Sequence, residues 1–129
     1  LGVAKHCHFM GGRSDVPDFL LGADLLLHPA RKENTGTVIL EAMVAGLPML
    51  VTAICGYAKH VTQSMAGRVI ASPFQQQHLN KSLAEMLLHD KKTWSEHALA
   101  YASSEDLYSM PEKAAEAIER VAREKNHAV

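Results

Sequence analysis

The chain has 129 residues, which is enough for one hydrophobic core and one domain. Its 13 basic and 14 acidic side chains nearly cancel, so neither a nucleic-acid footprint nor a polybasic membrane patch is indicated. The sequence contains no run of about 20 apolar residues of the kind that spans a bilayer, and its only cysteines are Cys7 and Cys55, which favours a reduced cytoplasmic protein over a disulfide framework.

Short apolar runs alternate with helical patterns in the first part of the chain. We expect a strand over 6–10, a helix that starts at Ser14 or Asp15 and ends at about Leu21, and a buried strand over 25–28. The last of these is an unbroken apolar run without a polar alternate face. Ligands of doubly wound sheets lie outside the carboxyl ends of the strands, so the turns after these strands are candidate ligand contacts.

The stretch 31–51, RKENTGTVILEAMVAGLPMLV, predicts a loop, a helix and a further strand. The helix covers about 37–45, because Gly46 is the common left-handed residue just past a helix and Pro48 cannot continue one. Its residues are apolar on almost every side, which predicts burial. The strand follows over 49–52.

Thr37 and Glu41 form the one polar line of this helix. Helical side chains lean towards the N-terminus, so Glu41 points to the start of its own helix, where free N–H groups favour an anion and Gly36 allows close approach. A carboxylate accepts hydrogen bonds, so Glu41 suits hydroxyl groups beside that anion, and a phosphate next to a ribose meets both demands. Glu33, on the preceding loop, can accept from further hydroxyls. Taken alone, Glu41 is equally compatible with a structural role as a partner of the helix dipole.

The second half of the chain continues the alternation. It predicts a strand over 67–71, helices over about 75–89 and 91–103, and a last helix that Ser109 and Glu112 start as a capping box. The apolar face of the last helix consists of four residues: Ala114, Ile118, Val121 and Ala122. Strands and helices in this order indicate a three-layer α/β arrangement.

Glu33 and Glu41, with Gly36 between them and EAMVAGLP following, resemble the E-x7-E signature of retaining glycosyltransferases of family 4, which have the GT-B fold. The segments DLLLHPA, CGYA and DLYSMPEKAA are similar to those of the lipopolysaccharide core glucosyltransferases of Gram-negative bacteria. The resemblance extends over essentially the whole chain. It implies an α/β fold with a Rossmann-like three-layer parallel sheet, part of the C-terminal domain of a GT-B glycosyltransferase.

The resemblance also implies a domain role and a site. Residues 1–129 would be the donor-binding domain without its N-terminal portion, and the final helix, about 110–126, would cross to a separate N-terminal domain. Glu33 is the implied catalytic residue. The implied donor site comprises Glu33, Gly36, Thr37, Val38 and Glu41, with Gly12, Arg13, Thr35 and Gly56 as secondary candidates. Many relatives carry two glycines and an acidic residue in the loop where this chain has Tyr57, Ala58 and His60, so the roles of Tyr57 and His60 are left open.

The implied donor is UDP-glucose, the acceptor is a heptose of the lipopolysaccharide inner core bound through the N-terminal domain, and no metal or other cofactor is expected. The expected location is the cytoplasm, with peripheral contact at the inner face of the inner membrane. We expect no nucleic-acid partner. We expect the chain by itself to fold, to be inactive and to self-associate through surfaces that a second domain would cover.

Three other interpretations of the sequence were considered. From the residues alone, the chain is also compatible with a non-catalytic nucleotide-sugar-binding or scaffold module. Paired carboxylates also occur in glycosidases, but a carboxylate beside backbone N–H donors suits a nucleotide better than a free glycan. His6, Cys7 and His8 suggest a metal site, yet no second ligand pair has recognisable spacing, so we interpret them as strand packing.

Overall fold

The computed structural model describes residues 2–126, with the side chains described as far as Arg120 and at Arg123. Its centre is a parallel sheet of three strands in the order β1 (Leu26–His28), β2 (Met49–Thr52) and β3 (Gly67–Ile70). Leu26 lies opposite Met49 in the first pair of strands, and Val51 lies opposite Val69 in the second. Four strands were predicted, and the predicted bounds of these three are correct to within one residue at each end.

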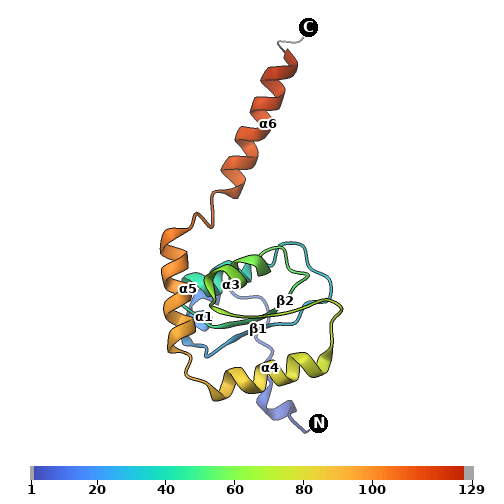
Figure 1. The fold of residues 1–129 in the computed structure, drawn as a ribbon, viewed down its shortest axis with the longest axis vertical. Helices are drawn as coiled ribbons and strands as arrows, with labels where there is room; N and C mark the ends of the chain where they lie inside the picture. Colours follow the sequence, from blue (N-terminus) through green and yellow to red (C-terminus); the bar gives the residue numbers. More distant parts are fainter. Residues whose placement is uncertain (1, 127–129) are drawn as a thin grey trace.

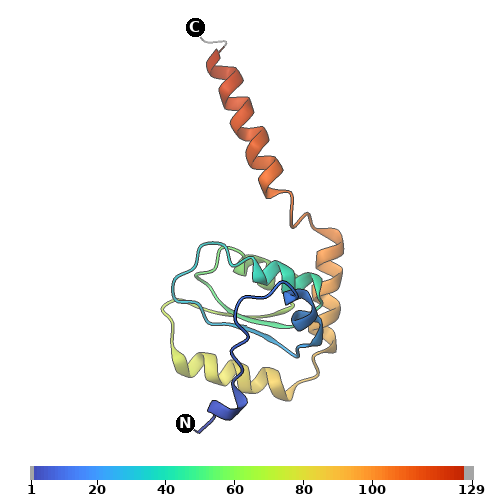
Figure 2. The same cartoon turned by 180° about the vertical axis from the view of Figure 1, so that it is seen from behind.

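Helices cover the sheet from both sides, which gives three layers (Figure 1). Helices α1 (Val16–Gly22), α2 (Val38–Val44) and α3 (Ala58–Ser64) lie on one face, and α4 (Gln76–Leu88) lies on the other. Helix α5 (Lys92–Ser104) runs along the side of the molecule past both layers (Figures 1 and 2). This arrangement confirms the predicted Rossmann-like α/β fold.

Strand β2 shows why the sheet needs cover on both faces. Met49 and Val51 point into the cluster formed with α2 and α3, and Leu50 between them points into the cluster formed with α4. All three side chains are completely buried. Alternate residues of a strand face opposite sides, so an unbroken apolar run here fills two separate halves of the core.

Two strand predictions need correction. Residues 6–10 form no strand: a 3-10 turn, Ala4–His6, is followed by irregular chain, and Phe9 is 99% exposed. A strand is stabilised by ladder bonds to a neighbour, and no segment of the described chain pairs with this one. In β1, which lies at the edge, Leu27 is 39% exposed rather than buried, because α4 packs against β3 at the opposite edge.

Helix α3 connects β2 to β3 and was not predicted. Its sequence, AKHVTQS, mixes good helix formers (Ala, Lys and Gln) with poorer ones (His, Val, Thr and Ser), so it gives no clear helical signal. The helix ends at Met65, which adopts the left-handed conformation (φ 56°) without being a glycine, so the usual stop signal is absent. Burial of Ala58 and Val61 against the core explains why the segment is nevertheless helical.

Helix α6 (Met110–Asn126) projects away from the sheet and its covering helices (Figures 1 and 2). The apolar face of α6 has no partner in the described chain: Ala114 is exposed and Ile118 is 71% exposed. Val121 and Ala122, the other two residues of this face, lie outside the described side chains. Within residues 2–126, no helix is long and apolar enough to cross a bilayer.

Candidate functional site

The loops that follow β1 and β2 are joined at the carboxyl edge of the sheet. The Gly56 N–H donates to the carbonyl of Asn34 (3.1 Å), and the Tyr57 N–H donates to the carbonyl of Thr35 (3.0 Å). A Cβ on Gly56 would lie 2.8 Å from the Asn34 oxygen, so this close approach requires a glycine. Thr35 and Gly56, two of the secondary candidates, thus connect the two loops and hold the segment that carries Glu33.

Glu33 lies beside the end of β1. Its Oε1 accepts a hydrogen bond from the Asn34 N–H (2.8 Å), and its Oε2 lies 3.4 Å from Nε2 of His28. The second separation lacks hydrogen-bond geometry, so the buried His28 Nε2 makes no hydrogen bond within the described residues. A buried polar atom without a partner carries a desolvation cost, and a ligand that bonds to His28 beside Glu33 would remove it.

The start of α2 lies between the two predicted glutamates. Gly36 is buried and left-handed (φ +73°), and a Cβ there would lie 3.2 Å from Cδ1 of Ile39 and 3.7 Å from Cγ of Glu33. Among the described residues, the N–H groups of Gly36, Thr37 and Val38 donate to no protein acceptor, and the Thr37 side chain does not cap the helix. Three backbone donors are therefore left for an acceptor from outside the chain.

Glu41 lines a groove of about 200 Å³ on the α6 side of this helix start. Its side chain is exposed and makes no hydrogen bond or ion pair with another described residue. The groove has eight lining residues: Thr37, Leu40, Glu41, Tyr57, Leu107, Tyr108, Met110 and Pro111. Burial raises the pKa of Tyr108, and the negative charge of Glu41 raises that pKa further, so the phenol and the carboxylate lie close together. Glu33 therefore lies beside the end of β1, and Glu41 lies in the groove between the α2 start and the α6 start.

Gly12 and Arg13 are not part of this arrangement. Arg13 forms a bidentate ion pair with Asp15 (2.7 Å) and lies over the ring of Phe19 (5.0 Å to the centroid), so its contacts are with α1. No Cβ contact would arise at Gly12 within 4 Å. In the described structure nothing connects these two residues to the edge that carries Glu33.

His60 and Tyr57 have distinct positions. Tyr57 lines the Glu41 groove, whereas His60 is tied to α5 through a 2.9 Å hydrogen bond between its Nδ1 and the Tyr101 hydroxyl. Because the Tyr101 proton is donated to Oε1 of Gln63 (2.9 Å), His60 Nδ1 must be the donor in this chain of bonds. Burial, followed by the charge of Lys59, lowers the pKa of His60 and favours the neutral ring.

Of the two cysteines only Cys55 has a packing position, and the expected strand packing of His6, Cys7 and His8 is wrong, because all three residues are exposed. Cys7 lies in the exposed irregular segment, and Cys55 is buried with its Sγ 3.8 Å from the Thr52 hydroxyl. Residues 2–126 contain no cluster of three His, Cys, Asp or Glu side chains that could hold a metal ion.

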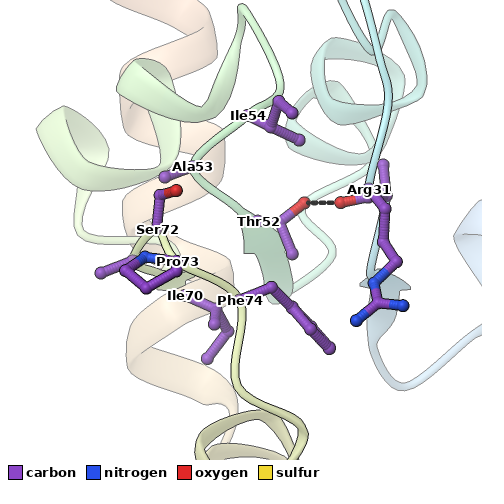
Figure 3. Close-up of a pocket in the computed structure, with 10 residues that line it drawn as sticks. Arg31, Thr52, Ala53, Ile54, Ile70, Ser72, Pro73 and Phe74 are labelled. Atoms are coloured by element: carbon purple, nitrogen blue, oxygen red, sulfur yellow. Dashed lines mark hydrogen bonds between the residues drawn. The ribbon is translucent and has the colours of Figure 1, made fainter.

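A second concave site, not predicted from the sequence, lies at the carboxyl ends of β2 and β3 (Figure 3). It has a volume of about 240 Å³ and is lined by ten residues: Ala30, Arg31, Thr52, Ala53, Ile54, Ile70, Ala71, Ser72, Pro73 and Phe74. The guanidinium of Arg31 lies over the ring of Phe74 (4.9 Å to the centroid), and the Thr52 hydroxyl donates to the Ala30 carbonyl (2.6 Å). The segment 71–74 reaches the site only through the pairing of β3 with β2, which no local pattern reveals.

Comparison with known proteins identifies the family. The family model described as "Glycosyl transferases group 1" matches residues 1–104. The chain belongs to the group 1 glycosyl transferases. The expected family resemblance is therefore confirmed, and Glu33, Gly36 and Glu41 all lie within the matched segment.

Two group 1 relatives and one solved structure illustrate the similarity. The chain is 50% identical over 120 residues to the lipopolysaccharide glucosyltransferase WaaG of Escherichia coli K12, covering 92% of this chain and 32% of that protein. It is 33% identical over 73 residues to the lipopolysaccharide core biosynthesis mannosyltransferase LpsB of Rhizobium meliloti, covering 55% of this chain and 21% of LpsB. The crystal structure of WaaG, described as a glycosyltransferase involved in lipopolysaccharide biosynthesis, superposes with a TM-score of 0.86 over 91% of this chain and 32% of that one. The chain thus spans about a third of the length of WaaG.

Proposed function

We propose that this chain is the donor-binding part of a retaining glycosyltransferase, and that the intact protein moves glucose from UDP-glucose to a heptose of the lipopolysaccharide inner core. The observation that carries the proposal is the pair Glu33 and Glu41 near a helix start with free backbone donors, in a group 1 glycosyl transferase. The 50% identity to WaaG, a lipopolysaccharide glucosyltransferase, supports the sugar and the acceptor class.

The nucleotide half of the donor fits the α2 start. The free N–H groups of Gly36, Thr37 and Val38 suit the phosphate oxygens, because backbone donors without protein partners bind anions well. The exposed carboxylate of Glu41 then accepts hydrogen bonds from the two ribose hydroxyls in the adjoining groove.

The sugar half of the donor fits the Glu33 side. In a glycosyl transfer the bond between the anomeric carbon and the diphosphate oxygen breaks, and the electron pair leaves with UDP while positive charge develops on the sugar ring. The oxygen of the acceptor hydroxyl then bonds to the anomeric carbon, and its proton goes to the leaving diphosphate. The Glu33 carboxylate stabilises that charge, which makes it the catalytic residue of this chain. A phosphate leaving group needs no strong general acid, but the leaving UDP needs positive charge. We propose that basic side chains on earlier segments of the intact protein supply that charge, without a metal.

The acceptor and the partner surfaces belong to the whole protein. We propose that residues 1–129 lack the acceptor site, and that α6 crosses to the N-terminal domain, which would cover its exposed face. The intact protein would work in the cytoplasm, in peripheral contact with the inner face of the inner membrane. Alone, this chain would bind the donor without turning it over.

The proposal is tested by measuring binding and transfer on a full-length protein that contains this chain. UDP and UDP-glucose should bind, and labelled glucose should appear on a lipopolysaccharide core that ends in heptose. Glu33→Gln should retain UDP binding and lose transfer. Binding of UDP-glucose without transfer would instead support the alternative, a non-catalytic nucleotide-sugar-binding or scaffold module.

A further inference from the structure

The concave site at the ends of β2 and β3 is separate from the proposed donor site. Its ten lining residues include none of the eight that line the Glu41 groove. The donor contacts proposed above involve the start of α2, whereas this site opens on the β3 side of the loop that carries Glu33 (Figure 3). The two sites are adjacent, because Arg31 lies two residues before Glu33 on the same loop. We call this second cavity the Arg31 pocket.

Arg31 gives the pocket a positive charge that no acidic side chain neutralises. Glu33, the nearest acidic residue in sequence, is turned towards His28 and the N–H of Asn34. Among the side chains that the structure describes, no carboxylate lies within ion-pairing distance of the Arg31 guanidinium. The guanidinium carbon lies 4.9 Å from the centroid of the Phe74 ring, and the guanidinium N–H groups donate to no described residue, so they are available to an anion.

The remaining lining groups suit a saccharide. The Ser72 hydroxyl, on the wall opposite Arg31, makes no hydrogen bond within the described residues and is available to a ligand hydroxyl (Figure 3). The Thr52 hydroxyl is already used to hold the Ala30 carbonyl, so it shapes the pocket and does not contact a ligand. Ile54 and Pro73 supply apolar surface of the kind that the C–H faces of a sugar ring contact.

The volume limits the size of the occupant. About 240 Å³ lies below the roughly 300–1,000 Å³ of pockets that enclose drug-sized ligands, so a single sugar unit with one charged substituent is the appropriate scale. We propose that the Arg31 pocket binds a sugar that carries a phosphate or carboxylate, with Arg31 holding the anionic group and the wall formed by Ser72 and Pro73 holding the ring. The identity of this sugar rests on the proposed function: it is a unit of the acceptor glycan and lies beside the reaction centre.

The test uses a full-length protein whose donor site is filled with UDP. Glucose 6-phosphate, glucose and inorganic phosphate are titrated separately, and binding is followed by NMR. Glucose 6-phosphate should bind tighter than either of the other two and should leave UDP in place. Arg31→Gln should weaken glucose 6-phosphate binding about tenfold, as expected for one lost charge-assisted bidentate contact. Lys32→Gln, which removes an adjacent charge outside the pocket, should change it less than twofold.

Each of several outcomes would overturn the inference. These are unchanged affinity in Arg31→Gln, displacement of glucose 6-phosphate by UDP, and inorganic phosphate binding as tightly as the sugar phosphate, which would reduce the site to an anion contact. The two proposals fail separately. If UDP does not bind, the donor assignment fails and the sugar titration still tests the Arg31 pocket, whereas if UDP binds and Arg31→Gln has no effect, only the pocket assignment fails.

Discussion

Replacing Glu41 with Ala in a full-length protein should separate nucleotide binding from folding. The Glu41 side chain is exposed and makes no hydrogen bond or ion pair with another described residue, so folding loses only the favourable position near the helix start, about 0.3–1 kcal/mol. The higher helix propensity of alanine offsets a few tenths of a kcal/mol of this loss in folding free energy. The net cost is therefore below about 1 kcal/mol, and the melting temperature should fall by only a few degrees.

The effect of Glu41→Ala on UDP should be much larger. Two hydroxyl hydrogen bonds to a carboxylate are worth about 1.5–3 kcal/mol each in the favourable limit, so even partial loss weakens binding at least tenfold. Calorimetry with UDP gives the affinity, and thermal unfolding of the same samples gives the stability. Glu33→Ala is the matched variant, because it should lower the transfer rate more than the UDP affinity.

Two results of the Glu41→Ala experiment would contradict the proposed role of Glu41. Unchanged UDP affinity would remove the ribose assignment and leave phosphate binding at the α2 start as its only nucleotide contact. Lower thermal stability with unchanged affinity would identify Glu41 as a structural dipole partner. The pKa of Tyr108 provides an internal control for the geometry: it should fall in Glu41→Ala, because the nearby negative charge that raises it has been removed.

Other predictions follow from the loops, the titrating groups and the exposed surface. Gly56→Ala should destabilise the fold by about 1–3 kcal/mol, because its Cβ would lie 2.8 Å from the Asn34 oxygen, whereas Gly12→Ala, with nothing within 4 Å, should leave the melting temperature unchanged; equal losses would contradict this contrast. Neutral His60 has a lowered pKa, so its contribution to stability is complete above pH 6.5 and is lost as the pH falls through the folded pKa; a His60→Gln variant whose stability depends on pH as strongly as wild type would argue against it. Hydrogen bonds from Lys113 and Ser109 lower the pKa of Asp106 to about 2, so an NMR titration of Asp106 should show no protonation near pH 3.8. Residues 1–129 alone should self-associate, since α6 is left uncovered, and a monodisperse monomer in sedimentation at high concentration would count against this.

Helices and strands whose apolar pattern and stop residues lie in the local sequence were predicted well. Helix α2 is one, because Gly46 adopts the expected left-handed conformation (φ +69°) and the apolar pattern around it is unambiguous. Helix α3 lacks such signals, since it ends at a left-handed Met65 and its helical state depends on tertiary burial. The expected strand over 6–10 failed for a related reason: its sequence suits a sheet, but strand structure requires a partner, and none pairs with it in residues 2–126.

In the candidate site, too, residues close together in sequence were predicted, and contacts that depend on tertiary structure were not. Glu33, Gly36 and Glu41 lie within one short stretch, so their spacing and helical geometry were enough to place them around the start of α2. The Arg31 pocket was missed, because Phe74 meets Arg31 only through the pairing of β3 with β2, and sequence separation gives no sign of that contact. Gly12 and Arg13 were named because they follow an expected strand and precede a helix; their role in donor binding stays a prediction, and the described contacts of Arg13 lie with Asp15 and Phe19.

The most direct test is transfer of labelled glucose from UDP-glucose to a heptose-terminated lipopolysaccharide core by a full-length protein, with the anomeric configuration of the product read by NMR. We predict transfer with retention of configuration, loss of transfer in Glu33→Gln, and retained UDP binding in that variant. Donor binding without transfer, or undiminished transfer by Glu33→Gln, would contradict the assignment of this chain as the catalytic donor-binding domain.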